Sequence, residues 1–176
     1  MSMTFVITSI ICNWRYKNHI ISYMLETPHV MVGAAIATKV GNPYLAIPLA
    51  FLSHFVLDRI PHWNPHFYTE SQKFGKPQKQ SVTIAVIDEI IALGAGLYIA
   101  YQFLPDYKMV ATIIACCFFA VLSDQIKYPF FFLKAKGGLL QKWTDWERSI
   151  QVEVSPFWGI LTQILTIITA GYWIWA

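Results

Sequence analysis

The stretch FLSHFVLDRIPHWNPH, residues 51–66, carries three of the five histidines in the chain and decides how the rest is organised. An apolar run leads into it, and Pro61 is expected to end the resulting helix, because proline cannot continue a helix and restricts the residue before it. His54 and Asp58 are four residues apart, so their side chains project from one helical face. A nitrogen and an oxygen ligand on one rigid element are what a zinc-like ion requires.

Asp58 lies in the last turn of that helix, where the negative end of the helix dipole disfavours a carboxylate by about 0.3–1 kcal/mol. Arg59 or a bound cation could offset this cost. His54 and Asp58 could equally form a buried hydrogen-bonded pair, with Arg59 neutralising the charge. His62 and His66 continue the four-residue spacing beyond the proline. The spacing alone leaves the metal site and the structural pair open.

The composition indicates a membrane protein. The 176 residues are 56% hydrophobic and 13% charged, and the mean hydropathy is +0.45. An ordinary soluble domain has roughly 25% charged residues. The lipid bilayer is therefore the expected partner, and one domain is expected from the length. The net charge of +3 is small and no basic stripe carries interleaved aromatics, so no nucleic-acid partner is expected. The three cysteines lack zinc-finger or disulfide-framework spacing.

The chain is expected to be all-α, forming a multi-pass membrane helical bundle over residues 24–176. Residues 1–23 are interpreted as an N-terminal extension, with Met24 as the natural start, because the interpretable signals begin there. A short helical hairpin follows, with helices over 28–40 and 43–60. Thr27 is expected to be the N-cap. About 13 residues, or ~20 Å, are too short to cross a bilayer.

Three longer apolar helices are expected over 82–104, 109–132 and 156–176, with a polar loop over 66–80. Residues 138–150 show helical periodicity and are expected to form an amphipathic helix in the membrane interface. Its apolar face would hold Leu139, Trp143, Trp146 and Ile150. Its opposite, polar face would hold Gln141, Lys142, Asp145, Glu147 and Arg148.

The basic segments 66–80 and 127–150 are separated by one helical hairpin, so they should lie on the same side of the membrane. The positive-inside rule makes that side cytoplasmic. The same topology brings the unusual ionisable residues to that end. They are His29, His54, Asp58, Asp88, Asp124 and Glu153. Ionisable groups in membrane helices are costly and tend to be functional, which favours a metal site over scattered structural pairs.

The motif Leu52–Asp58 followed by Pro61 resembles the Ser-His-x-x-x-Asp helix of membrane-bound metal-dependent hydrolases, the LexA-binding, inner-membrane-associated family. It is more distantly similar to the His-x-x-x-Asp helix of zinc-dependent phospholipase C, in which a proline and another ligand histidine follow, as Pro61 and His62 do here. The Thr-Pro-His sequence ending at His29 resembles the family's early ligand histidine. The Leu-Ser-Asp sequence ending at Asp124 resembles its Leu-Pro-Asp segment.

The resemblance implies an all-α fold in which histidines and aspartates of several helices bind metal and a phosphoester is hydrolysed. Two features depart from the family. Its His-Arg-Gly-x-Thr-His-Ser motif is absent, and the segment with Asp124 follows the helix with His54 instead of preceding it. A relative that binds metal without catalysis is therefore also open.

The leading hypothesis is a membrane-embedded metal-dependent hydrolase that acts on a phospholipid or other phosphoester at the cytoplasmic interface. Asp88 would be a bridging ligand or the base that orients water. The expected ligands of a divalent metal, preferably zinc, are His29, His54, Asp58, His62 and Asp124. The first alternative is a non-enzymatic membrane scaffold whose polar cluster is structural. The second is a transporter, which the gathering of polar groups at one end disfavours.

Overall fold

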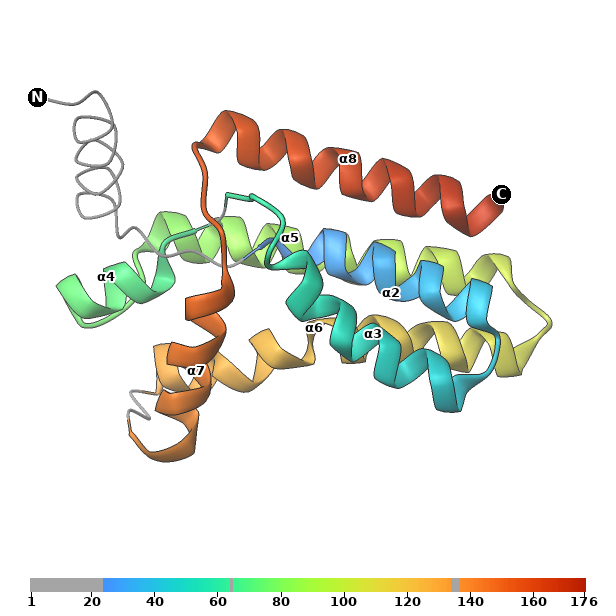
Figure 1. Ribbon diagram of the computed structural model, residues 1–176, viewed down its shortest axis with the longest axis horizontal. Coiled ribbons are helices and arrows are strands. Elements are labelled where there is room, and N and C mark those ends of the chain that lie inside the picture. Colours follow the sequence, from blue (N-terminus) through green and yellow to red (C-terminus); the bar gives the residue numbers. More distant parts are fainter. Residues whose placement is uncertain (1–23, 64, 134–136) are drawn as a thin grey trace, which may run out of the picture.

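A computed structural model describes residues 24–63, 65–133 and 137–176, and the extension expected over 1–23 lies outside them. The described part is all-α, as predicted, and its helices are arranged as in Figure 1. They are α2 (Glu26–Val40), α3 (Pro43–Leu57), α4 (Phe67–Phe74), α5 (Lys79–Gln102), α6 (Tyr107–Phe132), α7 (Gly138–Ile150) and α8 (Pro156–Trp175).

The central helix is α2, which packs against α3, α5, α6 and α8. Its small residues allow the neighbouring helices to approach closely. A Cβ atom added at Gly33 would lie 2.8 Å from the carbonyl oxygen of Cys116 and 2.9 Å from Cβ of Ala120 on α6. Ala34 and Ala35 are fully buried. The predicted N-terminal hairpin is therefore present, with α2 enclosed by its neighbours.

Both ends of this hairpin differ from the prediction. Thr27 does not cap α2, because the helix begins at Glu26 and the Thr27 hydroxyl donates to the Asp88 carboxylate of α5. The second helix, α3, ends at Leu57 instead of residue 60. After Leu57 the chain makes a tighter turn, in which the N–H of Ile60 donates to the carbonyl of Leu57, three residues earlier, over 2.8 Å. Asp58 thus lies at the C-cap of α3.

The prediction of a loop over 66–80 was wrong, because α4 forms there. Two aromatic side chains at its start anchor it to α6. Tyr68 stacks on Phe130 with ring centroids 6.0 Å apart, and Phe67 meets Phe131 at 5.8 Å. The charged residues around these aromatics obscured a short amphipathic helix with one apolar face.

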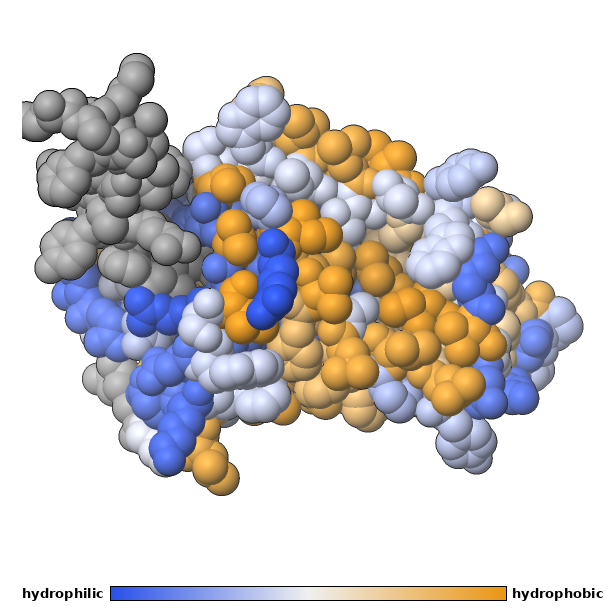
Figure 2. Space-filling model, viewed as in Figure 1, coloured by the Kyte–Doolittle hydropathy of each residue, from blue (hydrophilic) through white to orange (hydrophobic). Residues whose placement is uncertain are grey.

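Helices α5, α6 and α8 are long and apolar enough to cross a bilayer, which fits a membrane protein. At 15 residues each, α2 and α3 reach only about 22 Å, less than the ~30 Å hydrocarbon core. Figure 2 shows a largely hydrophobic face between more hydrophilic ends. Large apolar side chains point outward from the long helices, among them Ile90, Leu93, Leu97, Leu165 and Ile168.

The two basic segments lie at the same end of the bundle, as predicted. Helices α4 and α7 meet there, where the Tyr68 hydroxyl donates to Asp145 over 3.2 Å. The Arg148 guanidinium lies over the Tyr68 ring at 4.1 Å.

The segment between α7 and α8 fixes the end of α3. The Val152 N–H donates to the carbonyl of Asp58, and His62 exchanges backbone hydrogen bonds with residues 152 and 154 over 3.1 Å. The start of α8 then presses on the same segment. A Cβ at Gly159 would lie 2.2 Å from the backbone nitrogen of Trp63, so only glycine fits there. These contacts hold the chain around Asp58 and His62 in place.

Candidate metal centre

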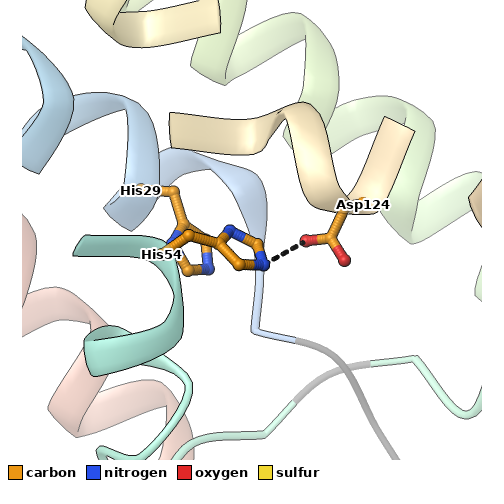
Figure 3. Close-up of side chains that lie close together, drawn as sticks. All are labelled: His29, His54 and Asp124. Atoms are coloured by element: carbon orange, nitrogen blue, oxygen red, sulfur yellow. Dashed lines mark ion pairs between the residues drawn. The ribbon is translucent and has the colours of Figure 1, made fainter. Parts of the chain in front are cut away.

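Four of the six predicted site residues meet in one buried cluster. His29 comes from the start of α2, His54 and Asp58 from the end of α3, and Asp124 from α6. Figure 3 shows the imidazoles of His29 and His54 side by side, with Asp124 facing them. The two rings stack with centroids 4.3 Å apart and an interplanar angle of 25°. These four residues therefore gather at one end of the bundle, as the order and direction of the helices predicted.

The ring nitrogen Nε2 of His54 is the centre of the cluster. It lies 3.5 Å from Oδ2 of Asp58 and 3.9 Å from Oδ2 of Asp124. The other nitrogen, Nδ1, lies 2.8 Å from the carbonyl oxygen of Ala120. A carbonyl can only accept, so Nδ1 carries a proton and donates it. Nε2 therefore faces the carboxylates either as a bare lone pair or bearing a cation.

His29 is fully buried, yet neither of its ring nitrogens has a hydrogen-bond partner among the described residues. The nearest carboxylate atom is Oδ1 of Asp58, 3.6 Å from Nε2 of His29, which is longer than a hydrogen bond. Buried polar groups are almost always hydrogen-bonded, because an unpaired one loses its interactions with water. The imidazole of His29 is thus positioned for an additional ligand.

Glu147 is the ligand candidate that the sequence prediction placed wrongly. It was expected on the solvated face of the amphipathic helix, but it is fully buried on α7. Its Oε1 lies 3.0 Å from Nε2 of His54, and its Oε2 accepts from the hydroxyl of Ser123 over 2.7 Å. Leu139, on the apolar face, is 84% exposed. Only part of the polar face turns inward, because Thr144 and Glu147 are buried whereas Lys142 and Asp145 are exposed. On the apolar face, Trp143 and Trp146 pack against Phe55 of α3.

Lys127 is the second residue that the prediction missed. It was given no part in the site and counted only in the basic segment 127–150, but only 1% of its surface is exposed. Its Nζ lies 2.5 Å from Oδ1 of Asp124 and also bonds Oε1 of Glu147. The spacing of three residues from Asp124 was the available signal. Arg59, the expected counter-ion of Asp58, is exposed instead.

His62 is buried at the edge of the cluster. Its Nδ1 lies 2.8 Å from the carbonyl oxygen of Ile60, so Nδ1 is the donor, and Nε2 has no partner among the described residues. A histidine oriented by a backbone carbonyl with its second nitrogen open is a common arrangement for metal ligands. Burial lowers the pKa of His62, although nearby Asp58 opposes the shift, which favours the neutral form that binds metal.

The carboxylates set the charge of His54. Its burial disfavours protonation, but Asp124, Glu147 and Asp58 outweigh this effect and raise the pKa of His54 to about 9. Burial likewise opposes ionisation of Asp58, yet the facing imidazoles hold its pKa below the ordinary value. The pKa of Glu147 is lowered despite burial, mainly by Lys127. Without a metal, a proton on His54 is thus the cation at Nε2.

Asp88, the predicted catalytic residue, belongs to α5. Its carboxylate lies beside the start of α2, outside the metal-ligand groups. Its carboxylate accepts from the Glu26 N–H and the Thr27 hydroxyl. A carboxylate at a helix N-terminus is stabilised by the free N–H groups and the helix dipole. The structure thus gives Asp88 a positioning contact two residues from His29. Glu153, also expected near the site, faces His66 at 3.6 Å.

Two overlapping groups of side chains have the geometry to hold a metal ion. One is His29, His54 and Asp124, and the other is His54, Asp58 and Glu147. In each group, one ligand atom per residue lies within 4.8 Å of the others, and all these residues are buried. Nitrogen and carboxylate donors of this kind suit zinc and other divalent transition metals.

A pocket adjoins the cluster between the start of α2 and helices α5 and α6. Asp124 and Lys127 line it on the side of the cluster, and Asp88 and Glu26 line it near α2. Its free volume is about 50 Å³, more than the roughly 10–15 Å³ that one water requires. The remaining lining is largely apolar, with Met24, Leu25, Ala85, Phe67 and Phe131. The carboxylate of Asp124 is therefore shared between the cluster and an accessible space.

Comparison of the chain with protein-family models, curated proteins and solved structures found no match.

Proposed function

We propose that the buried cluster binds a divalent metal ion, preferably zinc, and that the protein is a membrane-embedded metal-dependent hydrolase of phosphoesters. The observation that carries this proposal is the environment of His54. Its Nδ1 donates to a carbonyl, so a bare Nε2 lone pair would be repelled by the oxygens of Asp58, Asp124 and Glu147. The cation that Nε2 needs is a proton in the metal-free protein and would be the metal ion in the loaded one. A cation at that point removes the repulsion. The proposed ligands are His29, His54, Asp58 and Asp124, with His62 and Glu147 available beside them.

A divalent ion held by His29, His54, Asp58 and Asp124 would polarise a phosphoryl oxygen and would lower the pKa of a bound water molecule toward neutrality. The chain's own residues supply the surroundings. Asp124 belongs both to the cluster and to the pocket, so a substrate group in the pocket would lie beside the metal ligands. The apolar lining of the pocket excludes bulk water and suits a membrane-borne phosphoester such as a phospholipid. Asp88 is proposed to orient the attacking water or to hold the start of α2.

The pocket lies at the end of the bundle that carries the basic segments of α4 and α7. By the positive-inside rule this end is proposed to face the cytoplasm, which would place the reaction at the cytoplasmic interface of an inner membrane. Exposed apolar side chains on amphipathic α7, Leu139 and Trp146, support a position in that interface.

The test is hydrolysis by protein purified in detergent and then depleted of metal by chelation. Bis-p-nitrophenyl phosphate and mixed phospholipid micelles are the substrates. We expect hydrolysis that Zn²⁺ or Mn²⁺ restores in the wild type but not in His54→Ala. His66→Ala is the matched control, because His66 lies outside the cluster and faces Glu153. Equal residual hydrolysis in wild type and His54→Ala would reject the enzymatic proposal.

The structure also offers support for the non-enzymatic alternative. Lys127 pairs with both Asp124 and Glu147, and a protonated His54 extends this ion-pair network without metal. In that case the cluster would only join α3, α6 and α7, as in a membrane scaffold. This alternative predicts loss of stability on substitution and no metal bound in stoichiometric amount.

A further inference from the structure

We infer that the centre holds a single divalent ion, with the ammonium group of Lys127 standing where a second metal would otherwise be needed. This inference rests on the proposed metal site and assigns its occupancy. It starts from the fact that the carboxylates of the cluster face two ways. Asp124 directs Oδ2 toward Nε2 of His54 at 3.9 Å and Oδ1 toward Nζ of Lys127 at 2.5 Å.

Glu147 repeats this arrangement from another helix. Its Oε1 contacts both Nε2 of His54 and Nζ of Lys127. In hydrolases with two metals, the ions lie about 3.5–4 Å apart and act on one substrate together. Here Asp124 of α6 and Glu147 of α7 each face two cation positions. One position is beside Nε2 of His54, and the other is filled by Nζ of Lys127.

The charges of the cluster agree with one ion. Asp58, Asp124 and Glu147 contribute three negative charges and Lys127 one positive charge, with all four side chains buried. When the histidines are neutral, as metal ligation requires, two negative charges remain. One divalent ion neutralises them, whereas two ions would leave an excess positive charge in a buried site, which is costly.

The remaining acids near the site do not change this count. The Asp88 carboxylate is engaged by the Glu26 N–H and the Thr27 hydroxyl at the N-terminus of α2, where the helix dipole compensates its charge. Glu89 accepts hydrogen bonds from the side chains of Gln125 and Tyr128. Glu26 is buried and lines the pocket beside Asp124, and burial raises its pKa, so it enters the count as a neutral acid. Lys127 is therefore the internal cation that sets how many metal ions the cluster needs.

The test is equilibrium dialysis of full-length protein in detergent against saturating Zn²⁺, with bound metal measured by elemental mass spectrometry. Wild type, Lys127→Arg and Lys127→Met are compared. We expect one equivalent in wild type and in Lys127→Arg, which keeps the charge. Lys127→Met has a similar length without the charge, so three negative charges remain and one divalent ion no longer neutralises them. We expect its bound metal to rise above one equivalent.

The results separate failure of the proposed role of Lys127 from failure of the proposed metal site. Two equivalents in wild type would overturn the role of Lys127 and leave the metal site standing. No bound metal in wild type would overturn the proposed function itself. One equivalent in folded Lys127→Met would contradict the substitution of a metal by the ammonium group. If Lys127→Met does not fold, the wild-type stoichiometry still decides, because two equivalents are incompatible with a filled second position.

Discussion

Nε2 of His54 lies 3.0 Å from Oε1 of Glu147, although 93 residues separate the two in sequence. This contact joins the end of α3 to α7, the amphipathic helix that runs from Gly138 to Ile150. It places a third buried carboxylate beside Asp58 and Asp124. The cluster therefore depends on α7 folding back across the end of the bundle, as well as on α2, α3 and α6, which hold the remaining ligands.

Replacing Glu147 by alanine should destabilise the fold and weaken metal binding together. The change leaves the buried Lys127 without one of its partners, and removing one side of a buried ion pair costs about 3–5 kcal/mol. Thermal unfolding of the purified protein in detergent measures the loss. Asp145→Asn is the control, since it removes a negative charge from an exposed position of the same helix. Equal stability of the two variants would mean that Glu147 does not act as a buried ion-pair partner.

Metal affinity should rise with pH. In the metal-free protein the carboxylates raise the pKa of His54 to about 9, so a metal ion must displace a proton from it below that pH. Between about pH 6.5 and pH 8 the affinity should increase by roughly tenfold per pH unit for the one displaced proton. Titration with a chelator-buffered metal checks this slope. A flat profile would mean that His54 is already neutral.

The stability of the metal-free protein should change in the opposite direction. A histidine whose pKa is higher in the folded protein than in the unfolded chain stabilises the fold most below its ordinary value of 6.5. That contribution is lost as the pH rises toward about 9. Thermal unfolding with chelator present should therefore show declining stability over this range, and an excess of Zn²⁺ should restore it. Stability that rises with pH in chelator would contradict the assignment.

Gly159→Ala should loosen the contact between α8 and the segment that carries His62. The new methyl group would overlap the backbone of Trp63 and cost about 1–3 kcal/mol. Gly171→Ala on the same helix is the control, because its Cβ would meet only Cε of Met31 at 3.6 Å. In a helix interior that change should be neutral or stabilising. Similar unfolding temperatures for the two variants would refute the tight contact.

Two substitutions distinguish whether Asp88 only positions α2 or also acts as the catalytic base. Asp88→Ala should cost about 1–2 kcal/mol, because the free N–H group of Glu26 loses its acceptor. Asp88→Asn keeps an oxygen that can accept this hydrogen bond, so it should retain most of the stability. If Asp88 is also the catalytic base, hydrolysis of bis-p-nitrophenyl phosphate is lost in both variants. Retained hydrolysis in Asp88→Asn would limit Asp88 to positioning α2.

The helices could be predicted because local signals mark them. Proline and glycine mark the hairpin around residues 41–43, and apolar runs of at least 20 residues mark the three long helices. The four-residue spacing of His54 and Asp58 put them on one face, and counting helices brought His29 and Asp124 to the same end. Each of these inferences needs only helical geometry and chain direction.

Glu147 and Lys127 could not be placed in this way. A hydrophobic pattern shows that a helix has two faces, but in a membrane protein the apolar face can point to lipid instead of the protein. The polar face of α7 was therefore assigned to solvent, although Thr144 and Glu147 are fully buried. Lys127 was missed for a related reason, because its partner Glu147 comes from a different helix and is brought near only by tertiary packing.

The most direct test of the metal centre is elemental mass spectrometry of protein purified in detergent without chelator, with wild type beside the double variant His54→Ala/Asp58→Ala. Circular dichroism confirms that both remain helical. The proposed site predicts a divalent transition metal in wild type, at one equivalent, and its loss from the double variant. A well-folded wild type without bound metal, unable to take up Zn²⁺ on dialysis, would contradict the metal centre and leave a structural ion-pair network in its place.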